Sequence, residues 1–383
     1  MRVVIYEENH DKLYPLTNLV PQFNLRVGAR TIAENSASFF RRCKVNLVCR
    51  ERFGMVMARS TEPAIYLSGR LLMTSGIALP RTDVRFVVDA DTVGFFKKDP
   101  PFPRTLDEIK DTLSRIRVTR KINGMVVKHA WDLIALNHTM LGRHYVAVRR
   151  KGRVIRNAYV RGKSIHVARG ARIHKLVFLD ATEGPIYIDR NAELLPFSSV
   201  VGPSYIGEGS IIDQAKVVGS SIGPQCRIGG EVENSIFQGY SNKHHDGFIG
   251  HAFIGEWVNL GALTTNSDLK NNYGPVRIHV GSEVHETGMT KLGCFVGDHS
   301  KLGIGTLIPT GAVIGSFVNF AGGGMMDVSV RDFQWIVGSR KEEYDLHKAL
   351  HTARIVMKRR GINFSQRYEE IIRILHGEIC RSN

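Results

Sequence analysis

Aliphatic residues recur every six positions through the C-terminal half of the chain, and this period constrains the fold more than any other feature. The series runs in two blocks: Ile188, Leu194, Val200, Ile206, Ile212, Ile222 and Ile228, and then Val296, Leu302, Ile308, Ile314 and Phe320. The frame slips inside the first block, near Val217. A period of six fits neither an α-helix nor an alternating strand.

A triangular coil explains this period. Each flat side is a short strand with one aliphatic residue pointing to the axis, and a small residue turns the corner. Glycine follows several periodic residues, as in Ile206-Gly207, Ile228-Gly229 and Ile314-Gly315. One coil cannot bury its own apolar edge, so coils must stack. We therefore predict a parallel β-helix over residues 185–327, left-handed as such solenoids usually are despite the right-handed crossover rule.

The first 150 residues have a different texture. Strand-like runs, such as residues 3–6, 45–48 and 84–88, alternate with helix-like ones. Thr105 is a suitable N-cap for a helix, because two acids follow it before the apolar spacing begins. This alternation predicts an α/β domain over residues 1–150.

Two further segments flank the repeat. Residues 151–184 are basic and contain glycine, which is typical of a connecting segment. Residues 328–383 follow the repeat, and helical spacing of apolar residues appears at 341–360 and again at 368–379. They predict a helical C-terminal tail.

Composition limits the partners. The formal net charge of +16 favours anionic ligands such as phosphorylated sugars, nucleotides and coenzyme A. No nucleic-acid-binding motif accompanies the charge, so we expect no nucleic-acid partner. Without a long apolar run or a signal-peptide core, we expect a cytoplasmic protein with no membrane partner. The five cysteines contain no CxxC pair, which argues against disulfides and a cysteine-rich zinc site.

The densest polar stretch, residues 240–278, interrupts the repeat. Histidines, lysines, asparagines and glycines gather there. A segment that leaves the frame of a rigid solenoid is expected to be a surface loop, and sites are usually built on such loops. The sequence therefore predicts the functional site in this stretch.

Two motifs carry a resemblance to a known family. Residues 245–262 read HDGFIGHAFIGEWVNLGA, followed by Asn-Asn-Tyr-Gly at 271–274. This run resembles the acetyltransferase signature of the bifunctional N-acetylglucosamine-1-phosphate uridyltransferase/glucosamine-1-phosphate N-acetyltransferase family. Residues 13–34, LYPLTNLVPQFNLRVGARTIAE, resemble the opening of a divergent sugar nucleotidyltransferase branch. The two matches lie in different predicted domains, so the resemblance extends over most of the chain.

The resemblance implies N-acetyl transfer from the co-substrate acetyl-CoA to glucosamine 1-phosphate, in the synthesis of a nucleotide sugar for cell-wall precursors. His245, three residues before Phe248, takes the position of the family's general base, and an imidazole can accept a proton near neutral pH. Asn259 takes the position of a sugar-binding asparagine. Ala262 takes the position beside the thioester, where a backbone N–H would steady the oxyanion.

Further substrate contacts are implied less uniquely. A second family asparagine maps to Asn266 or to Asn272, and Tyr273 belongs to the same motif. Phe248 stands where the family commonly has a tyrosine, so a hydroxyl that contacts the sugar phosphate is lost. The cations that could replace this contact are Lys243, Lys270 and Arg277.

The N-terminal domain departs further from the family. It has no GxGTRM-like loop to grip a triphosphate, which leaves Arg26 and Arg30 as cations for a nucleotide phosphate. The family's metal-binding aspartate is also absent, and Asp89 and Asp91 are the nearby acids. We expect either nucleotidyl transfer from UTP with Mg²⁺ or a domain without catalytic function.

Several alternatives stay open. His244 and His251 are rivals of His245 for the role of base. A γ-class carbonic anhydrase would use the same fold to hold zinc on three histidines, drawn from this stretch and from His279 or His285. A third hypothesis is a sugar-nucleotide-binding or scaffold protein without catalysis. For an enzyme of the resembling family, we expect a homotrimer with the acyl-CoA site between subunits.

Overall fold

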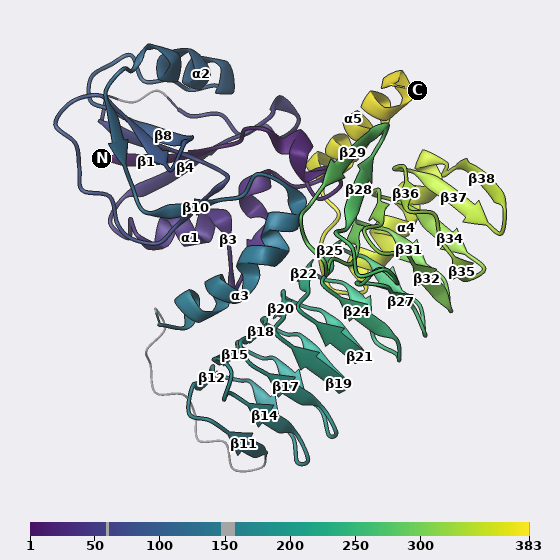
Figure 1. Cartoon of the computed structure of the whole chain (residues 1–383). Helices are drawn as coiled ribbons and strands as arrows, with labels where there is room; N and C mark the ends of the chain where they lie inside the picture. Colours follow the sequence, from purple (N-terminus) through teal and green to yellow (C-terminus); the bar gives the residue numbers. More distant parts are fainter. Residues whose placement is uncertain (59–60, 147–157, 383) are drawn as a thin grey trace. The chain divides into compact units, whose positions relative to one another are not determined.

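The computed structural model describes residues 1–58, 61–146 and 158–382, and the chain divides into two compact units. The first unit contains Met1–Leu13, Val20–Leu25 and Arg30–Ala130. The second contains Tyr14–Leu19, Arg26–Ala29 and the described part of the chain from Trp131 onward (Figure 1).

The break between the two compact units lies earlier in the chain than the predicted boundary at residue 150, because almost all of helix α3 (Ala130–Val146) belongs to the second unit. Asn137 on α3 accepts hydrogen bonds at Oδ1 from Ser221 Oγ and from the backbone N–H of Gly28, both at 2.7 Å. These two bonds tie the helix and an early segment of the chain to the strands of the second unit.

The first unit is built on a mixed six-stranded sheet, which confirms the predicted α/β domain. Its strands lie in the order β4 (Lys44–Val48), β1 (Arg2–Tyr6), β5 (Ala64–Ser68), β8 (Asp91–Lys97), β7 (Val84–Val88) and β9 (Thr119–Lys121). The smaller elements are α1 (Ile32–Ser38), β3 (Arg30–Thr31), β6 (Leu71–Met73) and β10 (Gly124–Val126). Helix α2 (Leu106–Arg115) begins where the sequence predicts, since the Thr105 side chain accepts from the backbone N–H of Glu108.

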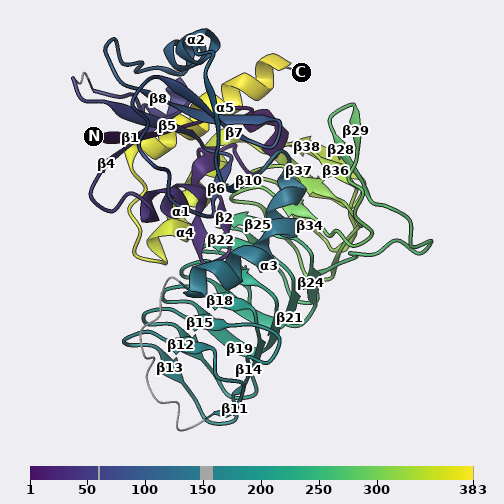
Figure 2. The same cartoon turned by 60° about the vertical axis from the view of Figure 1, so that its left-hand side comes forward.

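The second unit is a solenoid whose coils each have three short sides, and the left-handed β-helix is confirmed. The first side is a nine-stranded parallel sheet: β12 (Ile165–Val167), β15 (Ile186–Ile188), β18 (Ser204–Ile206), β20 (Ser221–Ile222), β22 (Ile236–Gly239), β25 (Phe253–Glu256), β30 (Phe295–Val296), β33 (Val313–Ile314) and β36 (Ser329–Val330). Figure 2 shows the stack from another direction.

The long strands β19 (Ile211–Val218) and β21 (Arg227–Glu233) run around a corner and so contribute to both other sides. The second side also contains β13 (Arg172–Ile173), β16 (Glu193–Leu194), β23 (Asn242–Lys243), β26 (Asn259–Leu260), β31 (Lys301–Leu302), β34 (Asn319–Ala321) and β37 (Gln334–Val337). The third side contains β11 (Tyr159–Arg161), β14 (Phe178–Asp180), β17 (Ser199–Val201), β24 (Phe248–Gly250), β27 (Thr265–Asn266), β32 (Thr306–Ile308) and β35 (Gly324–Met325).

One residue from each strand points to the axis, and these residues form three inward rows that make up the core of the solenoid. The second-side row reads Ile212, Ile228, Lys243, Leu260, Leu302, Phe320 and Ile336. The third-side row reads Val217, Val232, Ile249, Asn266, Ile308 and Met326. Each of the two rows is therefore broken by one polar residue.

The solenoid is longer than the predicted residues 185–327. It begins at β11, so residues 158–184 form its first coil and the start of the second, and the predicted connecting segment 151–184 is wrong there. Residues 151–157 lie outside the described residues. Val330 and Ile336 continue the inward rows beyond Asp327. The step from Leu179 to the next core residue of the repeat is irregular, which hides the first coil from a six-residue frame.

The predicted surface loop over residues 240–278 is also corrected, because the coil continues to Asn266. The chain then leaves the stack, forms the hairpin of β28 (Arg277–Val280) and β29 (Glu283–Glu286), and returns at β30. The backbone N–H of Leu292 donates to Asp268 O at the base of this excursion, at 2.9 Å. We call residues 269–291 the inserted loop.

The C-terminal tail is helical only in part. β38 (Arg340–Glu343) pairs antiparallel with β37, so the start of the predicted helix at 341–360 is a strand. α4 (Leu346–Lys358) and α5 (Gln366–Ser382) then confirm two C-terminal helices. Among the described residues, no helix is both long enough and apolar enough to span a membrane.

The two polar residues in the inward rows are held by main-chain groups. The Lys243 Nζ donates to Gly229 O at 3.1 Å and to His245 O, and the side chain is 1% exposed. The Asn266 carboxamide pairs with one residue of the adjacent coil: Gly250 N–H donates to its Oδ1 at 2.7 Å, and its Nδ2 donates to Gly250 O at 2.9 Å. Asn266 therefore replaces the two backbone bonds of a ladder between β24 and β27.

Burial lowers the pKa of Lys243 to about 8, so we predict that its contribution to stability depends on pH. In the unfolded chain the lysine has its ordinary pKa of 10.5, so that state binds more protons between about pH 8 and pH 10. The free energy of unfolding of the wild type should therefore rise relative to Lys243→Met across this range, by up to roughly 3 kcal/mol. Chemical denaturation at several pH values measures it.

Leu260→Met is the matched control, because it changes packing in the same inward row without a titratable group. Its difference from the wild type should not change with pH. A constant difference between wild type and Lys243→Met over the same range would show that the lysine does not titrate in this window.

Candidate functional site

The corner between the second and third sides of the solenoid brings two predicted site residues together. His245 lies at this corner in one coil, between β23 and β24, and Ala262 lies at it in the next coil, between β26 and β27. The backbone N–H of Leu263 donates to Asp246 O at 2.8 Å, which joins the two coils at this point. His245 is exposed, so its imidazole is accessible to solvent.

The backbone of this corner is held from both sides. Gly247 has φ +124°, and a Cβ there would lie 2.2 Å from Thr264 O, so only glycine lets the coils approach this closely. From inside, the Lys243 ammonium donates to the carbonyl of His245. The predicted role of Lys243 as a substrate contact is therefore corrected, because the ammonium lies in the solenoid interior and binds main-chain carbonyls.

The three histidines of this stretch have different surroundings. The rings of His244 and His245 meet edge to face at 5.2 Å, and His244 Nε2 lies 3.9 Å from Asp213 Oδ2. His251 is half-buried, and its Nδ1 lies 2.7 Å from Asp268 Oδ2. A carboxylate on one ring nitrogen orients an imidazole for proton transfer at the other, so His251 remains a rival base with a defined partner.

Sequence reasoning missed Asp268. It lies directly before the inserted loop, and its backbone carbonyl receives the Leu292 N–H where that loop returns. Asp268 lies 17 residues after His251, and the two side chains pair because the chain leaves the stack at Asp268. The spacing of about one coil is the only signal in the sequence that relates the two residues.

Phe248 lies on β24, next to the His251–Asp268 pair. A Cβ on Gly250 would lie 2.3 Å from Phe248 Cζ and 2.8 Å from Asp268 Oδ2, so the phenyl ring and the carboxylate both lie over this glycine. Gly250 thus leaves the space in which the aromatic ring, the acid and His251 meet. Phe248, a predicted substrate contact, is half-buried.

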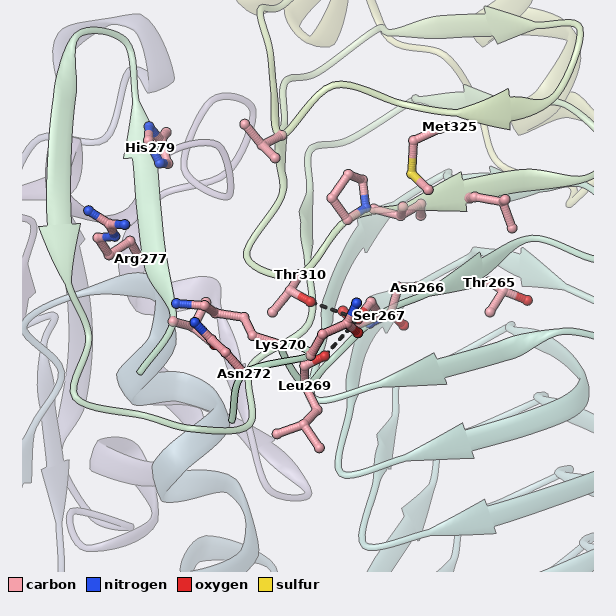
Figure 3. A pocket seen from close by; sticks show the side chains of 16 residues that line it. Thr265, Asn266, Ser267, Leu269, Lys270, Asn272, Arg277, His279, Thr310 and Met325 are labelled. Atoms are coloured by element: carbon pink, nitrogen blue, oxygen red, sulfur yellow. Dashed lines mark hydrogen bonds between the residues drawn. The ribbon is translucent and has the colours of Figure 1, made fainter. Parts of the chain in front are cut away.

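A pocket of about 780 Å³ lies on the third side of the solenoid, where the inserted loop faces β27 and β32 (Figure 3). Its loop side carries Lys270, Asn272, Arg277 and His279, and its solenoid side carries Thr265, Asn266, Ser267, Leu307, Ile308, Pro309 and Thr310, with Met325 and Val328 at one end. Thr310 Oγ1 donates to Ser267 Oγ at 2.7 Å, and Ser267 Oγ donates to Leu269 O at 3.1 Å. One wall is therefore cationic and the other is mostly apolar.

Some of the contact residues predicted in the loop line the pocket, and one does not. Lys270 and Arg277 line it, and the Lys270 Nζ donates to Pro275 O at 2.9 Å. Asn272 lines it as well, and its Oδ1 accepts from the Gly274 N–H at 3.1 Å. Tyr273 is 73% exposed and does not line the pocket. Asn266 contributes to the pocket wall, but its carboxamide is engaged with Gly250, which corrects its predicted role as a substrate ligand.

Asn259 lies on the second side of the solenoid, outside the lining of the pocket. It stands opposite Asn242 in the ladder, and the Asn242 Nδ2 donates to its Oδ1 at 3.3 Å. Arg360, which follows α4, donates to Asn242 Oδ1 at 2.6 Å. Asn259 is exposed. Through Asn242 it is linked to Arg360, a cation of the C-terminal tail.

The histidines do not converge on a metal site. Within the described residues, no group of metal-binding side chains close enough to share one ion includes His244, His245, His251, His279 or His285. The γ-class carbonic anhydrase hypothesis needs three such histidines. The structure therefore gives it no support.

Arg26 does not have its predicted role. Its backbone N–H donates to Gln238 Oε1 at 2.9 Å, its guanidinium donates to Ala29 O at 3.1 Å, and the guanidinium lies 5.4 Å from the centre of the Tyr205 ring. The residue is 7% exposed within the solenoid unit, so packing rather than phosphate binding explains it. Arg30, the other predicted cation, lies half-buried on β3 of the first unit.

Ion pairs follow the carboxyl ends of β1 and β5 in the first unit, the edge where ligands bind in parallel sheets. Arg50 Nε lies 2.9 Å from Glu7 Oε2, and Arg70 lies 2.9 Å from Glu8 Oε1. Asp91, a candidate metal ligand, lies 2.8 Å from Lys128 Nζ. Each of these carboxylates is thus held by a cation of the same unit.

Comparisons with known proteins add the family context. Residues 3–152 match the family model of the sugar nucleotidyl transferases. The chain is similar to a bifunctional sugar-1-phosphate nucleotidylyltransferase/acetyltransferase of Sulfurisphaera tokodaii, with 29% identity over 34% of this chain and 30% of the relative. It is similar to the bifunctional protein GlmU of Trichodesmium erythraeum, with 29% identity over 41% of this chain and 30% of the relative.

A third relative agrees with these two. The bifunctional protein GlmU of a Picosynechococcus strain is 31% identical over 41% of this chain and 31% of the relative. The chain thus spans about a third of the length of these curated relatives. The resemblance predicted from the motifs is confirmed: the chain is similar, at low identity, to bifunctional sugar-1-phosphate nucleotidyltransferases and acetyltransferases, and it carries a sugar nucleotidyl transferase domain model and a left-handed β-helix.

Proposed function

We propose that the solenoid transfers an acetyl group from acetyl-CoA to the amine of an amino-sugar 1-phosphate, with glucosamine 1-phosphate as the substrate. The observation that carries the proposal is the placement of exposed His245 one coil away from Ala262, at a corner held from inside by Lys243. Similarity to proteins named as acetyltransferases supports the same reaction class.

The reaction assigns a role to each of these residues. The amine nitrogen attacks the thioester carbon, and the His245 imidazole takes the proton that the amine loses. The backbone N–H of Ala262 stabilises the oxyanion of the tetrahedral intermediate. The carbon–sulfur bond then breaks, and the proton on His245 passes to the leaving thiolate of coenzyme A.

The pocket on the third side is the proposed place for the sugar phosphate. Lys270 and Arg277 lie on its loop wall and would replace the hydroxyl that Phe248 lacks. Asn272 lies on the same wall and can bond the sugar hydroxyl groups. The apolar wall formed by Leu307 and Met325 would contact the ring face or the acyl group.

His245→Ala should lower the rate of coenzyme A release by roughly 10²- to 10⁴-fold, because the amine would lose its general base. The measurement is a thiol-detection assay with acetyl-CoA and glucosamine 1-phosphate. His244→Ala is the matched control, because it removes the adjacent exposed imidazole and should leave most of the rate.

His251→Ala separates the two bases. If it abolishes the rate while His245→Ala does not, the His251–Asp268 pair is the base and our assignment is wrong. If the wild type releases no coenzyme A with any amino-sugar phosphate, the hypothesis of a binding or scaffold protein replaces acetyl transfer.

We also propose that three copies of the chain assemble around this corner. Large apolar residues stand exposed at the same corner in two pairs of consecutive coils, Leu176 with Phe197 and Leu263 with Ile304, and their exposed fractions lie between 49% and 70%. Three coils with polar or glycine corners separate the two pairs, and one of these is the coil of His245. The Phe197 N–H donates to Leu176 O at 3.2 Å, so the first two are stacked neighbours. Exposed apolar residues at both ends of the same corner favour an interface there, and a neighbouring copy would then complete the acyl-CoA site.

Ile304→Asp should convert the trimer to a monomer, since it puts a charge beside the exposed Leu263 at the proposed interface. Light scattering after size-exclusion chromatography should give a mass of three times 42.8 kDa for the wild type and 42.8 kDa for the variant. Coenzyme A release should fall with the trimer. Ile355→Asp, at an exposed isoleucine of α4, is the control that should keep both; a monomeric wild type would contradict the assembly.

We infer a second activity for the first unit, nucleotidyl transfer from UTP to the sugar 1-phosphate. The match of residues 3–152 to the sugar nucleotidyl transferase model favours it. We expect the nucleotide at the carboxyl ends of the sheet strands, the edge at which Glu7 and Glu8 form their ion pairs. Arg30 is the cation left from the two that the sequence predicted for the nucleotide phosphates.

Pyrophosphate release from UTP and N-acetylglucosamine 1-phosphate, with Mg²⁺ added, tests this activity. Arg30→Ala should slow it by about 10- to 100-fold if the guanidinium binds phosphate. Arg2→Ala, which changes an arginine on β1, is the control and should not change it. Absence of pyrophosphate from the wild type would mean that the first unit has no catalytic function.

A further inference from the structure

Three potential metal ligands meet at the C-terminal end of the second unit. Glu343 is the last residue of β38, and His376 and Cys380 lie one helical turn apart on α5. His376 Nε2 lies 2.8 Å from Glu343 Oε1, and Cys380 Sγ lies 3.9 Å from each of these two atoms. The three donor atoms thus form a small triangle between a strand and a helix.

The size of this triangle fits one tetrahedral ion. Zinc binds sulfur at about 2.3 Å and nitrogen or oxygen at about 2.0–2.2 Å, which places its ligand atoms roughly 3–4 Å from one another. The present contact between His376 and Glu343 is a hydrogen bond, so an ion would take the place of its proton. A donor set of one nitrogen, one sulfur and one oxygen favours zinc over magnesium or calcium.

The surroundings support binding of a divalent cation. The site borders a pocket of about 300 Å³, which leaves room for a water as the fourth ligand. A thiolate and a carboxylate together neutralise two positive charges. The cations nearby are partly engaged: Lys341 pairs with Asp327, and Arg340 pairs with Glu342. Arg331 also lines the pocket, and Asp332 lies beside it.

The histidine is already oriented. The His376 and Phe333 rings are nearly perpendicular with their centres 4.9 Å apart, and only 17% of the His376 side chain is exposed. Glu343 and Cys380 are exposed, so an ion can enter from solvent. In this orientation the His376 Nε2 faces Glu343, and the Cys380 thiol lies near both side chains.

We propose that Glu343, His376 and Cys380 bind one zinc ion, which fastens the last turn of α5 to the hairpin of β37 and β38. This hairpin ends the solenoid, and the ion would hold a helix across it. None of these residues lines the pocket of the inserted loop or lies at the His245 corner. The proposal is therefore independent of the proposed acetyl transfer.

Cobalt provides a direct test, because a thiolate bound to Co²⁺ gives a charge-transfer absorption band. Full-length protein, reduced and freed of metal by a chelator, should bind one Co²⁺ per chain with this band, and Zn²⁺ should displace it. Cys380→Ser should remove the band. His376→Gln and Glu343→Gln should weaken binding by at least about tenfold.

Cys43→Ser is the control, since Cys43 is another partly exposed thiol, and it should keep the band. Zn²⁺ should raise the unfolding temperature of the wild type and not that of Cys380→Ser, because only an intact site binds the folded state selectively. Absence of the band in the wild type, or its persistence in Cys380→Ser, would overturn the site.

Discussion

Stacking of coil on coil is the interaction on which the second unit depends. No coil can bury its own apolar edge, so each inward residue must be matched by those above and below it. The three inward rows run from the coil of Val167 to the coil of Ile336 and are aliphatic or aromatic at almost every position. The two polar exceptions, Lys243 and Asn266, occur in consecutive coils, beside the candidate site. Each is tolerated because main-chain groups satisfy its side chain.

The six-residue period predicted the solenoid because it is a direct consequence of this stacking. The limits of the solenoid were harder to predict, because corners vary in length. Steps of five residues, as from Val217 to Ile222, shift the frame, and a longer step after Leu179 hides the first coil. A six-residue repeat that accepts polar residues would have predicted inward positions for Lys243, six residues before Ile249, and for Asn266, six residues after Leu260.

The repeat predicts which site residues lie close together in consecutive coils, but it does not predict contacts made where the chain leaves the solenoid. His245 and Ala262 are one coil apart in sequence, so their proximity follows from the repeat. Asp268 pairs with His251 only because the inserted loop leaves the stack at that point. Arg26 packs on Gln238, 212 residues away, and no local pattern relates them. Contacts of this kind depend on how separate segments meet, which a pattern along the chain does not record.

Main-chain carbonyls at the corner explain why a lysine is buried at position 243. The carbonyls of Gly229 and His245 both accept from the Lys243 Nζ, so an apolar residue at position 243 would leave two acceptors of the interior without this donor. Keeping an ammonium there costs desolvation, as its lowered pKa indicates. Local rules of packing are broken mainly at functional or strained sites. The Lys243 ammonium donates to the carbonyl of His245, and this is the physical reason to assign the proposed base to His245 rather than to its neighbour His244.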